Sequence, residues 1–130
     1  MDPRLLDAAR QAMAKAYVPN SKFTVGAAIL GDDGVIYAGC NVENASYPEG
    51  WCAETSAIAA MVLGGVRKIR EIAVIGPGDQ LTTPCGGCRQ RIAEFATAET
   101  PVHICGVEGL RRSFKLGELL PAAFAQENLA

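Results

Sequence analysis

The chain has 130 residues, of which 49% are hydrophobic and 20% charged, a balance that excludes an intrinsically disordered protein. Its formal net charge of −2 excludes the broad positive field that nucleic-acid-binding proteins present. The length suits a single domain over residues 1–130 with one hydrophobic core.

The first half of the chain predicts a helix, an antiparallel pair of strands and a second helix. Asp2 is a helix cap, and Pro3 follows it at the first helical position. The second helix is apolar nearly all round, as expected of a helix that is buried against a sheet. In chain order we expect a helix over about 3–16, strands over 23–30 and 35–40 around a turn at 31–34, a polar loop over 41–50, and a helix over 51–63.

The second half predicts alternating strands and helices. The expected elements are a strand over 71–75, a loop over 76–84, a helix over 86–95, a strand over 102–107 and a helical turn over 117–120. A hairpin followed by helix, strand, helix and strand predicts an α/β fold, in which helices cover the faces of one mixed sheet.

The cysteines are numerous, with five of them against one histidine. No apolar signal core follows the charged start of the chain, and no run of about 18 uncharged apolar residues occurs, so we expect neither secretion nor a membrane span. The chain is therefore expected to be cytoplasmic. Cysteines in that compartment are more often metal ligands or catalytic groups than disulfide partners.

The strongest local motif is the segment 84–89, with the sequence PCGGCR. Cys85 and Cys88 are three residues apart, so their thiols meet on one face of a first helical turn and can bind one metal ion. The amide dipoles at a helix start also favour thiolates over thiols. A redox Cys-x-x-Cys pair or two core cysteines are the alternatives that this motif leaves open.

A second motif, Cys52-Ala53-Glu54, opens the helix over 51–63. Glu54 is the only charged residue of that helix, and a lone carboxylate among apolar residues is costly unless it has a function. A partly exposed glutamate stabilised by the helix dipole is the alternative. Residues two apart do not share a helical face, so we expect Cys52 on a metal and Glu54 beside it.

Together, Cys52, Cys85 and Cys88 form a set of three thiolates at the starts of two helices. Three protein ligands leave one position of a tetrahedral Zn²⁺ ion open, which is typical of a catalytic zinc site. Thiolates also favour Zn²⁺ over harder cations. Water on such an ion, next to the carboxylate of Glu54, is an activated nucleophile with its own proton acceptor.

These motifs resemble the three-cysteine signature of zinc nucleobase deaminases, and more narrowly the small homotetrameric cytidine deaminases. The resemblance covers residues 17–129 and includes the blocks 21–28, 39–47, 88–90 and 117–124. It implies a three-layer α-β-α sandwich with a mixed five-stranded sheet and one Zn²⁺ per subunit. It also implies hydrolysis of cytidine and 2′-deoxycytidine to uridine and 2′-deoxyuridine plus ammonia, in pyrimidine salvage.

The resemblance also implies which residues contact the nucleoside. Asn41 and Glu43 are two apart, so in an extended segment they point the same way, which suits sugar hydroxyls but also an ordinary polar loop. Their positions match the ribose-binding residues of the family. The other implied contacts are Phe23 in the nucleoside pocket, the backbone of Ala53 and the loop before Cys85 at the base, and Ala45, Tyr47 and Phe124 from a neighbouring subunit. The implied assembly is a homotetramer with composite active sites.

In the implied mechanism, Glu54 takes a proton from zinc-activated water that attacks C4 of cytosine, passes it to N3 and then helps to protonate the departing ammonia. The chain departs from the family at Thr55, where an arginine usually hydrogen-bonds the ligand sulfurs. Three thiolates around Zn²⁺ leave a net negative charge. We expect the helix N-termini and Arg89 to compensate part of it.

Two alternative functions use the same motifs. One is deamination of another cytosine-containing nucleoside, such as a nucleoside antibiotic. The other is a structural zinc module, for which Cys40, Cys105 or His103 would supply a fourth ligand. We expect Cys40 and Cys105 to be small core residues instead, and His103 to be a hydrogen-bonded structural histidine on the opposite face of its strand from its neighbours.

Overall fold

A computed structural model of the chain describes residues 1–130, and at its centre lies one five-stranded sheet with the order β2-β1-β3-β4-β5. The strands are β1 (Gly26–Gly31), β2 (Ile36–Cys40), β3 (Ile69–Ile75), β4 (Pro101–Gly106) and β5 (Gly109–Lys115). Only β3 and β4 pair in parallel, and the other neighbours pair antiparallel. The sheet is therefore mixed, as predicted.

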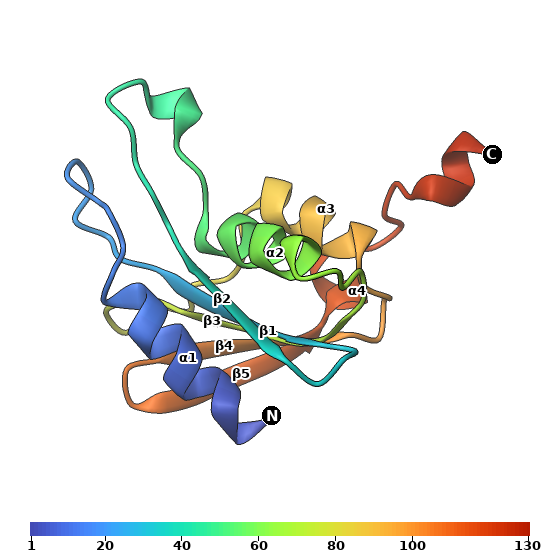
Figure 1. Cartoon of the computed structure of the whole chain (residues 1–130), viewed down its shortest axis with the longest axis horizontal. Helices are drawn as coiled ribbons and strands as arrows, with labels where there is room; N and C mark the ends of the chain where they lie inside the picture. The colour runs from blue at the N-terminus through green and yellow to red at the C-terminus, as the bar shows by residue number, and fades with distance from the viewer.

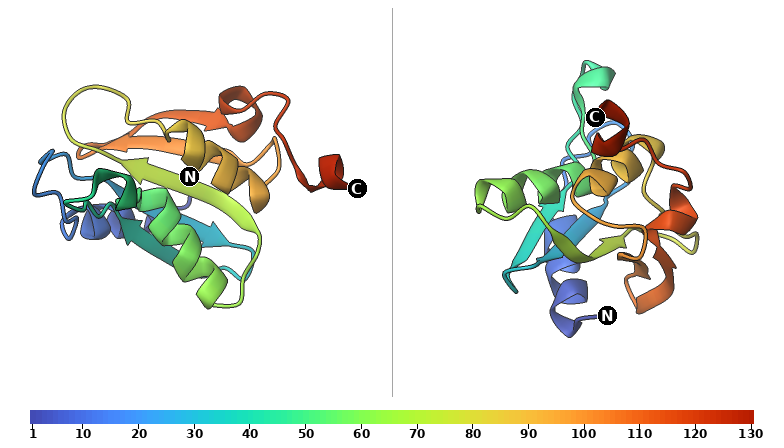
Figure 2. Two further views of the ribbon diagram at one scale, coloured as in Figure 1. Left: turned by 90° about the horizontal axis from the view of Figure 1, so that it is seen from above. Right: turned by 90° about the vertical axis from the view of Figure 1, so that its right-hand side faces the viewer.

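Helices cover both faces of the sheet (Figure 1). They are α1 (Pro3–Met13), α2 (Ala53–Leu63), α3 (Gly86–Glu94) and the short α4 (Leu116–Leu119), with 3₁₀ turns η1 (Tyr47–Glu49) and η2 (Gln126–Leu129). α1 covers one face, whereas α2 and α3 lie side by side on the other (Figure 2). A larger hydrophobic core fills the α2/α3 side and a smaller one lies under α1. The predicted three-layer sandwich is confirmed.

Two segments extend away from these layers, the loop that carries η1 and the C-terminal segment that carries η2 (Figures 1 and 2). Neither segment belongs to the sheet. None of the helices combines the length and the apolar character that crossing a bilayer requires.

Two boundaries near the N-terminus differ from the prediction. α1 ends at Met13 rather than near residue 16, because the amide of Tyr17 donates to the carbonyl of Asn41 and turns the chain toward the edge of the sheet. β1 begins at Gly26 rather than at residue 23. Just before β1, the Asn41 side chain accepts from the Val25 amide and donates to the Phe23 carbonyl, and the Asn41 amide donates to the Val25 carbonyl.

No apolar run in the sequence predicts the edge strand β5. Its exposed face carries charged side chains, and the guanidinium of Arg112 lies 4.4 Å from the ring centre of Phe114. From residue patterns alone we expect four strands. The fifth is implied only by the family resemblance, and the structure confirms it.

The position of α2 depends on a close approach to β2 at Gly39. A Cβ atom at this glycine would lie 2.4 Å from the amide nitrogen of Ala57 and 2.8 Å from the carbonyl oxygen of Ala53. The first turns of α2 therefore pack directly on β2. Only one face of α2 is buried, however, since the Leu63 side chain is 91% exposed. The helix is thus buried against the sheet as expected, while its other face stays exposed in the single chain.

His103 lies on the α1 side of β4 and is buried, as predicted. Its ring nitrogens lie 2.7 Å from the hydroxyl oxygen of Ser113 and 2.8 Å from a carboxylate oxygen of Glu71. Both nitrogens are thus satisfied by β5 and β3, and the histidine ties three neighbouring strands together. Cys105 is fully buried next to α1, whereas Cys40 is only partly buried.

Candidate active site

The three predicted metal ligands meet where α2 and α3 begin. Cys52 is the N-cap residue of α2, Cys85 is the N-cap residue of α3, and Cys88 lies in the first turn of α3. Their sulfur atoms all lie within 4.8 Å of one another, and those of Cys52 and Cys85 are 3.7 Å apart. All three cysteines are free thiols.

This geometry fits zinc. A tetrahedral zinc ion with Zn–S bonds of about 2.3 Å separates its sulfur ligands by about 3.8 Å, close to the spacing seen here. The cluster lies at the N-termini of α2 and α3, where the positive ends of the helix dipoles favour thiolates. Cys40, Cys105 and His103 lie outside the cluster, so no fourth protein ligand closes it. Three ligands with one open position are typical of a catalytic zinc site.

The thiols of the cluster differ in acidity. A hydrogen bond with Cys88 holds the pKa of the Cys52 thiol below its usual value. The same hydrogen bond, together with burial, raises the pKa of the Cys88 thiol. Cys88 is fully buried, so its ionised form needs a compensating positive charge such as a metal ion.

Glu54 lies beside this cluster, on the first turn of α2. Its side chain is only 4% exposed, and burial raises the pKa of its carboxyl group. A carboxyl group whose pKa is raised toward neutrality can both accept and return a proton. The alternative of a partly exposed glutamate is excluded by this burial.

Glu54 lines a cavity of about 330 Å³, and most of the other predicted site residues line it too. Those that line it are Phe23, Asn41, Glu43, Cys52, Ala53, Glu54 and Cys85. Its wall also contains Val25, Val42, Gly50, Trp51, Thr82 and Thr83. Of these, Trp51 directly precedes a predicted ligand, and its indole nitrogen donates to the Ser56 hydroxyl at 3.1 Å.

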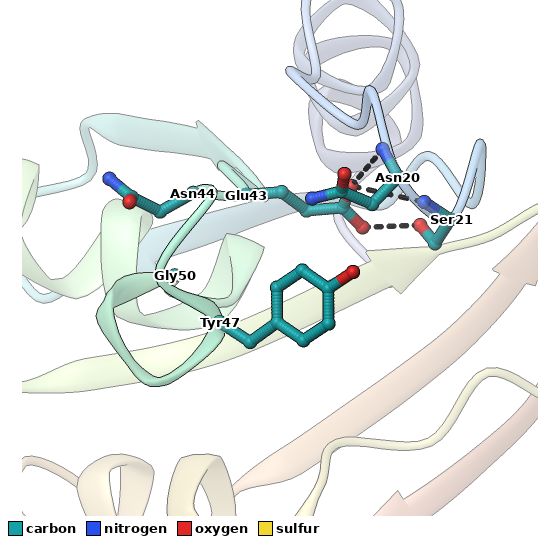
Figure 3. Close-up of a pocket in the computed structure, with 6 residues that line it drawn as sticks. All are labelled: Asn20, Ser21, Glu43, Asn44, Tyr47 and Gly50. Carbon is teal, nitrogen blue, oxygen red and sulfur yellow. Dashed lines mark hydrogen bonds between the residues drawn. The ribbon is translucent and has the colours of Figure 1, made fainter.

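Three predicted contact residues do not line this cavity. Ala45 is exposed on the loop before η1, and Phe124 is 59% exposed in the C-terminal segment. Tyr47 is 75% exposed and borders a neighbouring hollow of about 380 Å³, which it shares with Glu43 (Figure 3). All three lie on the two segments that extend away from the layers.

Asn41 and Glu43 hold the loop that precedes β1. The Asn41 side chain accepts from the Val25 amide and donates to the Phe23 carbonyl, each at 2.9 Å. Glu43 accepts from the amides of Asn20 and Ser21, at 2.9 Å and 3.1 Å, and from the Ser21 hydroxyl (Figure 3). Both side chains therefore line the cavity and also hold the loop that forms part of its wall.

The hydroxyl oxygen of Thr55 lies 3.7 Å from the sulfur of Cys88. Arg89, in contrast, donates to the carbonyls of Pro84 and Leu119 at 2.7 Å and 2.9 Å, and to the hydroxyl of Thr83 at 3.3 Å. All its hydrogen bonds go to oxygen atoms. Arg89 therefore does not donate to a ligand sulfur, and the neutral hydroxyl of Thr55 is the group that contacts the Cys88 sulfur.

Comparisons with known proteins agree with this geometry. The family described as the cytidine and deoxycytidylate deaminase zinc-binding region matches residues 1–104. The cytidine deaminase of Sporosarcina psychrophila is 42% identical over 127 residues, which cover 98% of this chain and 93% of the relative. That of Mycobacterium tuberculosis strain H37Rv is 40% identical and covers 93% of this chain and 87% of the relative.

Solved structures show the same similarity in space. The crystal structure of cytidine deaminase from Burkholderia pseudomallei aligns with a TM-score of 0.89 at 40% identity, covering 95% of this chain and 99% of the other. The crystal structure from Mycobacterium tuberculosis aligns with a TM-score of 0.79 at 41% identity, covering 93% and 94%. The chain therefore belongs to the cytidine and deoxycytidylate deaminase family.

Proposed function

We propose that the protein hydrolyses cytidine and 2′-deoxycytidine to uridine and 2′-deoxyuridine, with release of ammonia, and that residues 1–130 form one catalytic domain. The observation that carries this proposal is the buried carboxyl group of Glu54, which lies beside three free thiols and opens onto the cavity. A closed structural zinc site has no use for a buried carboxyl group beside it.

We assign one Zn²⁺ per subunit to Cys52, Cys85 and Cys88; when bound there, the ion supplies a Lewis acid that lowers the pKa of water. Glu54 accepts a proton from the water that attacks C4 and delivers it to N3 of the base. Glu54 then takes the remaining proton of the hydroxyl group on C4 and passes it to the amino group, so that the C4–N bond breaks, C4 becomes a carbonyl and ammonia leaves. Burial holds the pKa of Glu54 above the ordinary value of a carboxyl group, which makes it a stronger base toward water than an exposed glutamate.

The cavity wall orients the nucleoside. The backbone of Ala53 and the loop before Cys85 face the base, and Phe23 packs beside the nucleoside. Asn41 and Glu43 offer amide and carboxylate groups to the ribose hydroxyls, and both side chains line the cavity. We assign this half of the cavity to the sugar.

We further propose a homotetramer in which each active site is completed by a neighbour. Tyr47 and Phe124 are too exposed to be core residues, and neither lines the cavity of its own chain. The exposed face of α2, with Leu63, provides an apolar surface for assembly. The five free thiols suit a reducing compartment, so we place the enzyme in cytoplasmic pyrimidine salvage.

The test is to incubate the pure protein with cytidine and follow the loss of absorbance as uridine forms. We expect uridine and ammonia in equal amounts, loss of turnover with a zinc chelator, and recovery when Zn²⁺ is added back. Zinc-loaded protein that forms no uridine from cytidine would overturn the proposal. Turnover of a modified cytosine nucleoside alone would point to the related deaminase, and zinc without any turnover would point to a structural module.

Thr55→Val removes the hydroxyl next to Cys88 and keeps the shape of the side chain. We expect the affinity for Zn²⁺ to fall by about 10-fold or more, since hydrogen-bond partners of metal ligands typically contribute that much. Competition with a chelating dye measures this affinity directly. Ser56→Ala is the matched control, because its hydroxyl accepts from Trp51 rather than contacting a thiol. Equal zinc affinity in Thr55→Val and the wild type would contradict the assignment.

A further inference from the structure

The carboxylate of Glu43 is fixed by a single short loop. One of its oxygens accepts from the amides of Asn20 and Ser21, and the other accepts from the Ser21 hydroxyl (Figure 3). The Ser21 hydroxyl, and after it these two amides, hold the pKa of Glu43 below its ordinary value. The carboxylate is thus ionised and held in one orientation at the edge of the cavity.

The Ser21 hydroxyl has a second contact, because its oxygen accepts from the amide of Phe23 at 3.0 Å. Between them, Lys22 has a φ of 61°, a left-handed conformation that is uncommon for a residue other than glycine. Such a conformation persists only where surrounding contacts impose it. The Ser21 hydroxyl therefore lies between the amide of Phe23 and the carboxylate of Glu43.

We propose that Ser21 is a positioning residue that sets the recognition of the sugar hydroxyls. Its hydroxyl holds the second oxygen of Glu43, which no backbone amide contacts, so that this oxygen keeps a free lone pair for the ligand. Without the hydroxyl, only the two amides on the first oxygen remain, and the second oxygen is free to rotate away. This inference rests on the proposed function, since it takes the ligand to be a nucleoside.

The proposal predicts that loss of Ser21 weakens only ligands that have a 2′- or 3′-hydroxyl on the sugar. The probes are uridine, a product of the proposed reaction, and its analogue 2′,3′-dideoxyuridine; neither carries an amino group at C4 that could be hydrolysed. For Ser21→Ala we expect the Kd of uridine to rise by about 10-fold, as loss of a hydrogen bond to a charged group would give. The Kd of 2′,3′-dideoxyuridine should change by less than about 2-fold, because this ligand makes no use of Glu43. Calorimetry measures both values.

Two variants make the test specific. Ser21→Thr restores the hydroxyl at an exposed position and should bring the Kd of uridine back close to the wild-type value. Thr24→Val removes another hydroxyl of the same loop, one that has no hydrogen bond to Glu43, and should leave both Kd values unchanged.

An equal rise for both ligands in Ser21→Ala would mean that the loop has lost its shape, and would overturn the proposal. No change for uridine, or no rescue by Ser21→Thr, would overturn it as well. Turnover of cytidine by the wild type decides the proposed function separately. Binding of the two products thus tests Ser21 whether or not the chain deaminates cytidine.

Discussion

Glu54→Gln is expected to lower kcat for cytidine by at least about 10²–10⁴-fold, the usual contribution of general acid–base catalysis, while the zinc content stays at one ion per chain. Glutamine has nearly the same shape as glutamate, so the buried position beside the cysteines remains filled. The amide cannot take a proton from water or return one to the base. Measurement of kcat together with the zinc content of the same sample separates loss of chemistry from loss of metal.

Glu99→Gln provides the matched control for this variant. The Glu99 side chain is 76% exposed and forms an ion pair with Lys115. Glu99 does not line the cavity. The same change of carboxylate to amide should leave kcat within about 2-fold of the wild type. Turnover close to normal in zinc-loaded Glu54→Gln would show that another group moves the proton, and Glu54 would lose its assigned role.

The metal cluster could be predicted because its information is mostly local. Cys85 and Cys88 share one helical turn, and Cys52 begins another helix, so two short motifs define the ligands. That these motifs meet depends on α2 and α3 lying side by side on the sheet, which the alternation of strands and helices indicates. The placement of Glu54 beside the cluster was likewise indicated by the one charged residue in an apolar helix.

The rest depended on contacts between segments that are distant in the sequence. Glu43 and Ser21 are 22 residues apart, and no periodic pattern links a loop serine to a carboxylate. Arg89 illustrates the same limit, because its long side chain reaches Leu119, 30 residues away. Its charge suggested a partner for the sulfurs, but the carbonyl oxygens around it are better acceptors. Only the folded chain decides between such partners.

The edge strand β5 was missed for a different reason. Pattern-based prediction of a strand relies on apolar residues that alternate toward a core, and an edge strand with one open face needs few of them. β5 instead carries two arginines and a lysine, which discourage pairing with another chain. Its hydrogen bonds with β4 hold it in place. Backbone atoms form these bonds, and every residue type has the same backbone carbonyl, so the sequence does not indicate them.

Cys88→Ala is expected to reduce bound zinc from one ion per chain to a small fraction of that value, and to abolish turnover of cytidine with it. Two thiolates remain, of which Cys85 is exposed to solvent, and a pair of ligands cannot fix the geometry of the ion. Zinc binding also stabilises the folded chain, because the site does not exist in the unfolded one. A chelator should therefore lower the Tm of the wild type and leave the Tm of Cys88→Ala unchanged.

Cys105→Ala separates the loss of a ligand from the loss of a buried side chain. Cys88 and Cys105 are both 0% exposed, so each substitution removes the same atoms from a packed interior. Cys105 packs under α1 on the opposite face of the sheet and is not part of the cluster. Its variant should lose stability by about 1 kcal/mol, yet keep one zinc ion, normal turnover and a Tm that falls with chelator. One zinc ion per chain in Cys88→Ala, or an equal loss of zinc in both variants, would contradict the three-cysteine site. Loss in Cys88→Ala alone would tie the metal to the cluster at the starts of α2 and α3.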